Sequence, residues 1–502
     1  MAAGADLLTQ NVAERVVDGP SGGQSRRQTK IVCTLGPACY ESEQVRRLIQ
    51  AGADVIRLNF SHADHDWHSQ AIATVRAEAE RCGRHVAVMQ DLCGPKIRVS
   101  QIGRPDFTAE EGELIRLTTD QQIKASDGSL VFDLASTYDA LLDDVATGDR
   151  ILLDDGRIEL SVKEHHGATV SARVVRGGPV SVGKGINLPG VALSTESVTE
   201  KDWLDLQWAV KHEVDFVALS FVRHPEDVAR VQSFLVDAGS DAGVIAKIER
   251  PEALESIDEI IQLADGLMVA RGDLGLETDL AGVPLLQKHL IKRCREACKP
   301  VITATQMLES MIHNAMPTRA EVSDVANAIC DGTDAIMLSG ETAAGRFPIE
   351  AVRVLDRVAR VTEADISCDD ADMRRQSTST SSADAMVDGA AVTARALDAR
   401  RLVAYSQTGA TARMLARHRL STPVAAVTNR EITARQLNLS YGVEPIYLPQ
   451  IMIMPHLLHE LDRLASECGW GEAGDTVVVV SALDGQDGNT DTLHLHRIGP
   501  SW

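Results

Sequence analysis

Eight short apolar segments, separated by stretches with helical periodicity, constrain the fold of this chain more than any other feature. They lie at residues 29–36, 54–60, 86–92, 215–222, 243–249, 266–272, 300–306 and 335–341. Short apolar runs of this kind indicate strands buried on both faces, and helices between successive strands indicate parallel pairing. The pattern predicts a (β/α)8 barrel, and an open parallel sheet of seven or eight strands is the alternative.

The remaining sequence divides into further units. Between strands three and four, apolar and polar residues alternate, and an Asp155-Gly156 turn predicts a hairpin, which together indicate an inserted β-rich domain. The N-terminal segment is Gly/Ser-rich in its second half, which is typical of disorder. The predicted units are a disordered tail, a barrel domain, the insert, a linker and a C-terminal α/β domain, at residues 1–27, 28–96 with 185–365, 97–184, 366–387 and 388–502.

The amino-acid composition indicates which kinds of binding partner and which cellular compartment to expect. The 502 residues include 50 Lys and Arg against 72 Asp and Glu, a formal net charge of −22. Such acidity argues against nucleic acid or an anionic membrane as a bulk partner. The nine cysteines form no CxxC pair, and no stretch approaches the ~20 apolar residues of a membrane span or resembles a secretion signal. A reduced, cytoplasmic location is expected.

Charged residues follow the fifth and sixth predicted strands. Lys247 and Glu249 end one apolar run, and Asp273 follows the next. Ligands of parallel barrels bind at the carboxyl ends of the strands, so these three side chains are expected to meet at one mouth. An ammonium beside two carboxylates suits a divalent cation with an anionic substrate, whereas a structural ion-pair cluster is the alternative.

The second predicted strand ends in a polar stripe. Alternation along the strand places Arg57, Asn59 and Ser61 on one side. Arg57 can clamp a phosphate, and Asn59 and Ser61 offer oxygen ligands to a cation. A strand end whose polar groups simply bond to their neighbours is the alternative.

Three further places carry polar residues suited to a ligand. A Gly-Pro pair after strand three predicts a hinge into the insert, with Lys96 and Arg98 beside it. Lys184 lies between two glycines where the chain returns, and could contact phosphate when a lid closes. Thr305 places a hydroxyl at the end of strand seven.

In their order along the chain, these motifs resemble those of the pyruvate kinase family. The matching segments are TKIVCTLGPA, RLNFSH, GPKIR, KGINLPG, AKIE, ARGDLG, ATQMLESM, PTRAEVSDVANAI and IMLSGET. The resemblance implies a (β/α)8 TIM-barrel domain, an inserted β-barrel lid, a C-terminal α/β regulatory domain and a homotetramer. It also implies Mg2+-dependent (or Mn2+-dependent) transfer of a phosphoryl group from phosphoenolpyruvate to ADP, giving pyruvate and ATP.

The resemblance implies roles for the matching residues. Glu249 and Asp273 would hold the divalent metal, and Lys247 would stabilise the transferring phosphoryl group and the developing enolate. Thr305 would lie near the path of the proton that reaches the methylene carbon. The residues expected to bind substrate are Arg57, Lys247, Gly272, Asp273 and Thr305, and those expected to bind the nucleotide are Asn59, His62, Arg98 and Lys184.

One departure from the commonest family pattern predicts that K+ is not required. Many members carry threonine and glutamate after the aspartate of strand three and bind K+ there. Here Asp91 is kept, but Leu92 replaces the threonine and Lys96 replaces the glutamate. A fixed ammonium can supply the charge of K+, and the two cations would repel each other. The monovalent-cation region would comprise Asn59, Ser61, Asp91 and Lys96.

A loop of the C-terminal domain resembles the family's effector site. Ser406, Thr408, Gly409 and Thr411 lie between a predicted strand and a helix, where amides and hydroxyls could bind the phosphate of an allosteric effector. The later loop at 483–489 has two acids and no Lys or Arg, which favours a sugar or nucleotide monophosphate over fructose 1,6-bisphosphate. A turn that binds no ligand is the alternative.

Two other functional classes are compatible with parts of the pattern. Another phosphoenolpyruvate or 2-oxoacid barrel enzyme would share the metal carboxylates, but not the nucleotide-facing Arg98 and Lys184 with an inserted lid. A degenerate homologue kept as a regulatory binding protein would be expected to lose Lys247, Glu249 or Asp273, and all three are present.

Overall fold

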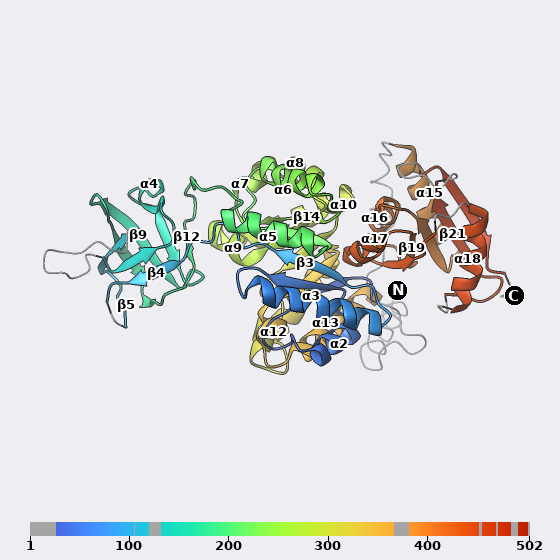
Figure 1. The fold of residues 1–502 in the computed structure, drawn as a ribbon, viewed down its shortest axis with the longest axis horizontal. Coiled ribbons are helices and arrows are strands. Elements are labelled where there is room, and N and C mark those ends of the chain that lie inside the picture. The colour runs from blue at the N-terminus through green and yellow to red at the C-terminus, as the bar shows by residue number, and fades with distance from the viewer. Residues whose placement is uncertain are drawn as a thin grey trace, which may run out of the picture.

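The computed structural model describes residues 27–104, 106–119, 132–365, 381–450, 454–467, 470–482 and 490–499. They form three units in a row, with the barrel in the centre, the insert at one end and the C-terminal domain at the other (Figure 1). The predicted tail up to residue 26, linker residues 366–380 and the loop at 483–489 lie outside the described residues.

Eight parallel strands close into a barrel, which confirms the fold predicted from the apolar segments. In order around the barrel they are β1 (Lys30–Thr34), β17 (Ala335–Leu338), β16 (Val301–Ala304), β15 (Gly266–Ala270), β14 (Gly243–Ile248), β13 (Phe216–Leu219), β3 (Ala87–Asp91) and β2 (Val55–Asn59). The sixth strand ends at Ala270, and the predicted strand residues Arg271 and Gly272 instead begin helix α9 (Arg271–Glu277). All strand carboxyl ends therefore open on the same mouth.

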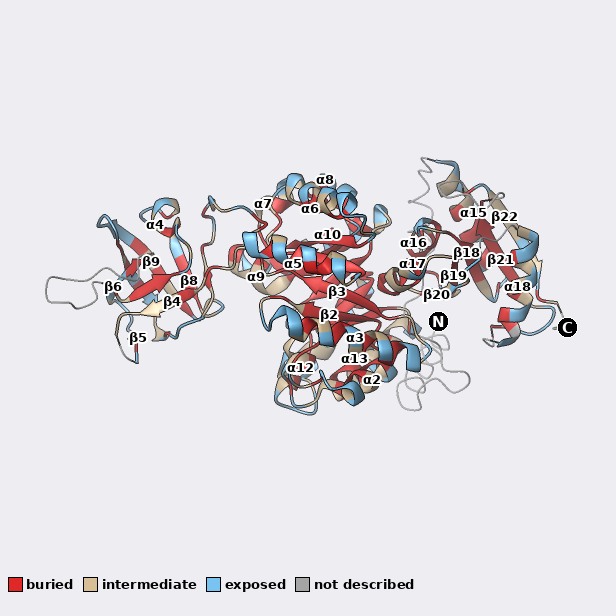
Figure 2. Cartoon of the chain, in the orientation of Figure 1, coloured by how far each residue is buried: buried red, intermediate tan, exposed pale blue. Residues whose placement is uncertain are grey.

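Alternation along each strand separates two hydrophobic cores. In β1, Ile31 and Cys33 face the layer between strands and helices, whereas Val32 faces the barrel interior. Both faces are buried, which explains the continuous apolar runs in the sequence (Figure 2). The main surrounding helices are α2 (Ser42–Ala51), α3 (His65–Arg81), α5 (Glu200–Lys211), α6 (Pro225–Asp237), α8 (Ile257–Leu263), α10 (Val283–Glu296), α11 (Arg319–Cys330) and α13 (Pro348–Asp365).

The insert is a nearly closed β-barrel that leaves the main barrel after β3 and returns before α5. Its seven-stranded sheet has the order β12 (Ile186–Asn187), β8 (Arg150–Leu153), β9 (Ile158–His165), β10 (Val170–Arg176), β6 (Leu114–Thr118), β7 (Leu134–Ser136) and β4 (Val99–Ile102). Because β12 pairs with β8, the sheet extends past residue 184 to Asn187. The insert has its own core, which includes Ile115, Leu160 and Val162.

The hairpin between β8 and β9 brings the insert onto the barrel domain. Asp154, Asp155 and Gly156 have φ values of 52°, 53° and 76°, as the predicted turn requires. A Cβ on Gly156 would lie 2.8 Å from Leu276 of α9, so the hairpin tip touches the helix that begins at the barrel mouth.

The C-terminal domain is a five-stranded sheet with helices. Its order is β20 (Val443–Tyr447), β19 (Val424–Thr428), β18 (Arg401–Tyr405), β21 (Thr476–Ser481) and β22 (Thr492–Arg497); β22 alone is antiparallel within this sheet. Its helices are α15 (Ser382–Ala396), α16 (Ala410–Ala416), α17 (Glu431–Gln436) and α18 (Met454–Glu467). The first helix begins inside the range assigned to the linker, because Ser381 caps it by accepting a hydrogen bond from Asp384 N at 3.1 Å. Among the helices of the described ranges, none has the length and hydropathy needed to cross a lipid bilayer.

Candidate active site at the barrel mouth

The ammonium of Lys247, near the carboxyl end of β14, is surrounded by oxygen atoms. Its Nζ lies 2.6 Å from Ser220 Oγ, 2.9 Å from Asp91 Oδ1 and 3.1 Å from Glu249 Oε1. Burial opposes the charged form, but the carboxylates of Asp91 and Glu249 outweigh it and raise the pKa of Lys247 above its ordinary value. Lys247 therefore supplies a permanent, precisely held positive charge.

Asp91 joins Lys247 to Arg57. The Oδ2 atom of Asp91 accepts from Arg57 Nε at 2.6 Å while Oδ1 faces Lys247. Burial acts to raise the pKa of Asp91, but Arg57 and Lys247 together lower it below its usual value. Arg57 also donates from Nη1 to the hydroxyl of Thr34 at 3.0 Å, and no described residue accepts from its Nη2. One edge of the guanidinium is thus fixed and the other remains available to an anion.

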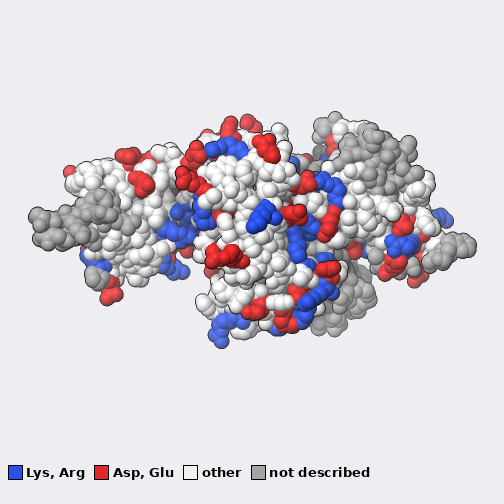
Figure 3. Space-filling view, in the orientation of Figure 1, with Lys and Arg blue, Asp and Glu red and all other residues white. Residues whose placement is uncertain are grey.

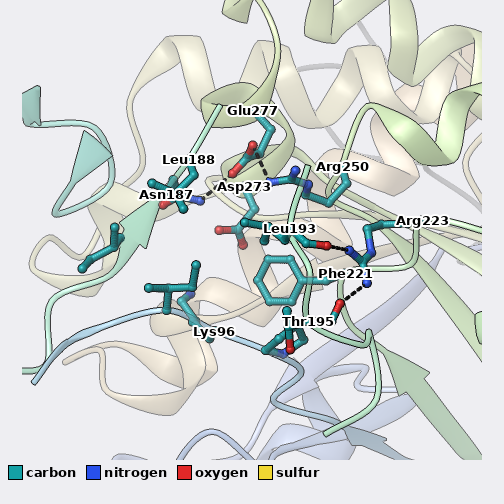
Figure 4. Close-up of a pocket in the computed structure, with 13 residues that line it drawn as sticks. Lys96, Asn187, Leu188, Leu193, Thr195, Phe221, Arg223, Arg250, Asp273 and Glu277 are labelled. Atoms are coloured by element: carbon teal, nitrogen blue, oxygen red, sulfur yellow. Dashed lines mark hydrogen bonds and ion pairs between the residues drawn. The ribbon is translucent and has the colours of Figure 1, made fainter. Parts of the chain in front are cut away.

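Glu249 and Asp273 form the predicted carboxylate pair. Glu249 Oε2 accepts from Phe221 N at 2.7 Å. Burial raises the pKa of Glu249, an effect that Lys247 partly offsets and the charge of Asp273 reinforces. Asp273 lies in the first turn of α9, points into the cleft in Figure 4, and has no hydrogen-bond or ion-pair partner among the described residues.

These carboxylates fit a divalent cation. Two negative groups close enough to repel, one of them without a protein partner, are stabilised when a cation binds between them. Within the described residues no group of three or more His, Cys, Asp or Glu side chains is arranged to hold a metal. A cation here would take its remaining ligands from substrate and water.

Thr305 links the end of β16 to the start of α9. Its hydroxyl accepts from Gly272 N at 2.8 Å and donates to Ala304 O at 2.6 Å. Its φ is 69°, a strained value for a β-branched residue, and such strain is concentrated at functional sites. Arg271 donates to Thr305 O at 2.7 Å and so braces this conformation.

Basic residues surround His62 on the side that faces the insert. Burial lowers the pKa of His62, and the positive charges of Arg98, Arg57 and Lys96 lower it further. The structure therefore brings four of the predicted site residues close together, namely Arg57, His62, Lys96 and Arg98. Figure 3 shows Lys and Arg side chains gathered where the insert meets the barrel.

The remaining predicted residues for nucleotide and cation divide between strand ends and the lid. Asn59 and Asp91 are register partners on adjacent strands, and Asn59 Oδ1 accepts from Ser61 N at 3.1 Å. Lys184 lies on the returning segment and forms an ion pair of 2.7 Å with Asp154 of the lid hairpin. Lys184 is thus held by a residue of the lid.

Comparison with family models and known proteins identifies the family. The model described as pyruvate kinase, barrel domain, matches residues 26–352, and the model described as pyruvate kinase, alpha/beta domain, matches residues 384–496. The chain belongs to the pyruvate kinase family. It is 43% identical over 478 residues to pyruvate kinase of Corynebacterium glutamicum, covering 94% of this chain and 98% of that protein.

Other pyruvate kinases support the same assignment. That of Mycobacterium tuberculosis is 43% identical over 477 residues, which cover 94% of this chain and 99% of the relative. The crystal structure of a pyruvate kinase from Cryptosporidium parvum superposes with a TM-score of 0.89 at 32% identity, covering 96% of this chain and 99% of that chain. The whole three-unit architecture is therefore that of the pyruvate kinase family, an enzyme family of phosphotransferases.

A cleft with about 460 Å3 of open space connects the pyruvate kinase site to the lid. Figure 4 shows Lys96, Phe221 and Asp273 on its walls. At one end, buried Arg250 donates to Glu277 Oε2 and to Val191 O, both at 2.8 Å. Glu277 in turn accepts from Asn187 of the lid sheet at 3.2 Å (Figure 4).

The predicted effector residues lie together in the loop between β18 and α16. Gly409 has a φ of 78° and donates from its amide to Ser406 Oγ at 3.0 Å. The hydroxyl of Thr411 is 2.9 Å from that of Thr490, and Thr408 O accepts from Arg413 at 3.1 Å.

Two residues that contact Lys247 and Arg57 were missed from the sequence. Ser220 accepts from Lys247 and donates to Leu92 O at 2.7 Å, and Thr34 accepts from Arg57. Ser220 directly follows the apolar run of β13, the same signal that identified the other strand ends. Thr34 is the last residue of β1, and the pairing of β1 with β2 brings it beside Arg57.

Proposed function

We propose that this chain transfers the phosphoryl group of phosphoenolpyruvate to ADP, taking up one proton to give pyruvate and ATP. The observation that carries the proposal is the position of Lys247, held between Asp91, Ser220 and Glu249 at the barrel mouth. Phosphoryl transfer depends on positioning and charge neutralisation, and this site offers little covalent chemistry but several fixed charges.

Each group of residues has a defined task in the proposed reaction. Arg57 presents its unoccupied Nη2 to the phosphate, while the ammonium of Lys247 neutralises charge on the transferring group and on the enolate left behind. The amide of Gly272, together with that of Asp273, receives the substrate carboxylate at the start of α9. In this structure the Gly272 amide donates to the hydroxyl of Thr305. In the proposed complex this hydroxyl would therefore lie beside the substrate carboxylate and near the methylene carbon.

Mg2+ or Mn2+ fits the site at Glu249 and Asp273, where it would polarise the substrate oxygens that it binds. ADP would enter from the insert side, where Arg98 and Lys96 lie near His62 and Asn59 ends strand β2. Lys184 would reach the nucleotide phosphates only by exchanging its partner Asp154, so we infer that its contact depends on lid movement.

A coupled assay of pyruvate formation tests the function directly. We expect turnover that requires phosphoenolpyruvate, ADP and Mg2+ or Mn2+ together. Pyruvate or another product released without ADP would indicate a different phosphoenolpyruvate enzyme. Binding of phosphoenolpyruvate without any turnover would indicate a regulatory homologue.

We also propose that K+ is not required. Asp91, the only carboxylate of the predicted cation region, is already neutralised by Arg57 and Lys247. Lys96 adds a further positive charge on the wall of the cleft between this site and the lid. A bound K+ would therefore meet repulsion rather than an unpaired carboxylate.

Steady-state turnover with K+ replaced by a bulky organic cation tests this proposal. We expect rates within about twofold of those in K+, and we expect Lys96→Met to lose about tenfold or more because a preorganised charge is removed. Strong activation of the unaltered enzyme on restoring K+ would contradict it.

Two further properties are proposed from the family. We infer a homotetramer, which light scattering on the purified full chain would test.

We also infer that a phosphorylated effector binds at Ser406, Thr408, Gly409 and Thr411. Thr408→Ala should weaken activation by a sugar or nucleotide monophosphate; no effect of any such compound would indicate that the loop is only a turn.

A further inference from the structure

A second cleft lies between the barrel and the C-terminal domain, at the end of the barrel opposite the catalytic mouth. It has about 210 Å3 of open space. Its barrel wall comes from the end of α10 and the segments before β16 and β17, and its other wall from α16 and the residues that follow. The lining residues are Arg295, Cys298, Lys299, Pro300, Asp334, Arg413, Ala416, Arg417, Arg419 and Ser440.

Positive charge dominates this cleft although the chain as a whole is acidic. Five of the lining residues are Lys or Arg and one is Asp, in a protein whose net charge is −22. Figure 3 shows basic side chains gathered where the barrel meets the C-terminal domain. A concentration of cations against the overall charge marks a site selective for an anion.

Part of this charge is balanced by the protein. Arg417 forms ion pairs of 2.9 Å with Asp384 and 2.7 Å with Asp388. Arg419 pairs with Asp334 at 2.9 Å and donates to Gly332 O at 2.7 Å, which joins the C-terminal domain to the barrel. These pairs fix the walls of the cleft.

Lys299 is a cation on the barrel side of this cleft. Its ammonium donates to Ala264 O at 2.6 Å, and it forms no ion pair with any described residue. Burial lowers the pKa of Lys299; the charge of Asp265 partly offsets this effect, and the charge of Arg413 adds to it. A half-buried ammonium with only a carbonyl partner is stabilised when an anion binds beside it.

We propose that this cleft binds the phosphate group of a small phosphorylated metabolite, held by Lys299 from the barrel and by Arg413 and Arg417 from the C-terminal domain. The site is separate from the catalytic mouth, and it differs from the loop at 406–411 in that both domains build it. A ligand that contacts both walls stabilises the junction of the two domains.

Site-specific acetylation in the unaltered full chain tests the proposal, with inorganic phosphate as the probe. Acetylation by acetic anhydride is followed by peptide mass spectrometry at Lys299 and at Lys292, an exposed lysine of the preceding helix α10 that lies 4.0 Å from the carboxylate of Glu296. We expect phosphate to slow acetylation of Lys299 about threefold or more and to leave Lys292 unchanged, because only Lys299 becomes covered. Equal rates at Lys299 with and without phosphate would overturn the proposal.

Matched variants give an independent measurement. Because the catalytic mouth and the 406–411 loop are the same in all of them, differences in the phosphate-induced rise of melting temperature report this cleft alone. We expect Lys299→Met to bind phosphate here about tenfold more weakly and to lose most of the rise, whereas Lys299→Arg and Lys292→Met keep it. A rise in Lys299→Met equal to that of the unaltered protein would also refute the site.

Discussion

At the scale of single residues, the site depends on how charges are shared. Lys247 and Arg57 both contact Asp91, so one buried carboxylate positions two cations that face the proposed phosphate. Neither cation depends on a flexible loop, because both lie on barrel strands. The arrangement is preorganised for charge that develops during transfer.

Replacing Lys247 tests this arrangement. Lys247→Met should lower kcat at least about 10²-fold, because the charge at the transferring phosphoryl group is lost while the shape of the side chain is largely kept. Ser220→Ala removes only a positioning hydroxyl and should cost less. Initial rates of the coupled assay measure both effects, and unchanged turnover in Lys247→Met would remove Lys247 from the catalytic residues.

His68 makes stability depend on pH near neutrality. Its ring stacks on Phe60 with a centroid distance of 3.9 Å, Nε2 donates to His62 O at 3.0 Å, and Nδ1 has no partner among the described residues. Burial lowers the pKa of His68 to about 4, since protonation would place an unsatisfied N–H in the core. An unfolded histidine titrates near 6.5, so stability should be full above pH 6.5 and fall between pH 6.5 and about 4, by at most about 1.4 kcal/mol per pH unit.

The difference in stability between the unaltered protein and the His68→Gln variant isolates the contribution of His68. Other histidines with lowered pKa values, His62, His85, His212 and His418, titrate in both proteins. His68→Gln keeps a donor for the His62 carbonyl but has no proton to gain. Melting curves at pH 7, 6 and 5 should therefore converge as pH falls, and parallel curves would show that His68 does not control this loss.

The sequence predicted the charged residues of the site but not their partners. Lys247, Glu249 and Asp273 could be predicted because each follows an apolar run, and parallel strands share one carboxyl edge. Thr34 is far from Arg57 in the sequence, and only the register of β1 with β2 places them side by side. The pairing of Lys184 with Asp154 likewise depends on how the lid hairpin folds back.

At the scale of elements, helix α9 connects the proposed active site at the barrel mouth to the lid. It begins with Gly272 and Asp273 at the catalytic mouth and ends at Glu277, which bonds Asn187 of the lid sheet. Arg250, directly after Glu249 in the sequence, is buried and donates to the other carboxylate oxygen of Glu277. Glu249 directly precedes Arg250, and Asp273 lies on the same helix as Glu277. The two carboxylates of the proposed metal site are therefore linked through the backbone to the Arg250–Glu277 ion pair next to the lid.

Two variants separate the lid contact from the structural ion pair. Asn187→Ala removes one hydrogen bond to a charged group, worth about 1.5 kcal/mol, and should raise the KM for ADP up to about tenfold without changing the melting temperature. Arg250→Met leaves Glu277 buried without its cation and should destabilise the barrel by about 3–5 kcal/mol. A normal KM for ADP in Asn187→Ala would show that this contact does not position the lid.

Element boundaries show where sequence patterns end. The segment 266–272 was predicted as one strand, but Arg271 and Gly272 turn into α9, whose first turn carries Asp273 near the positive end of the helix dipole. Strand β22 was not predicted, since its alternating His and Leu residues lie at the exposed sheet edge and lack an apolar run. The eight barrel strands were recovered because burial on both faces leaves a continuous apolar signal.

At the scale of the whole molecule, buried ion pairs fasten the C-terminal domain to the barrel. Asp215, fully buried before β13, accepts from Arg435 Nε of α17 at 2.6 Å and from Arg76 Nη2 of α3 at 2.9 Å. It also accepts from Val88 N at 2.7 Å, so the carboxylate joins two barrel elements to the C-terminal domain. Arg419 and Asp334 form a second such connection.

Removing one of these connections should uncouple the two domains. Arg435→Leu deletes the interdomain contact but leaves Asp215 paired with Arg76, so the barrel keeps its charge balance while the junction weakens by about 3 kcal/mol. Calorimetry of the full chain should then resolve a separate, earlier transition of the C-terminal domain. Arg463→Leu is the matched control, because Arg463 contacts only Glu460 and Glu467 of its own helix among the described residues. An unchanged calorimetric profile in Arg435→Leu, or the same change in Arg463→Leu, would mean that the buried pair does not couple the domains.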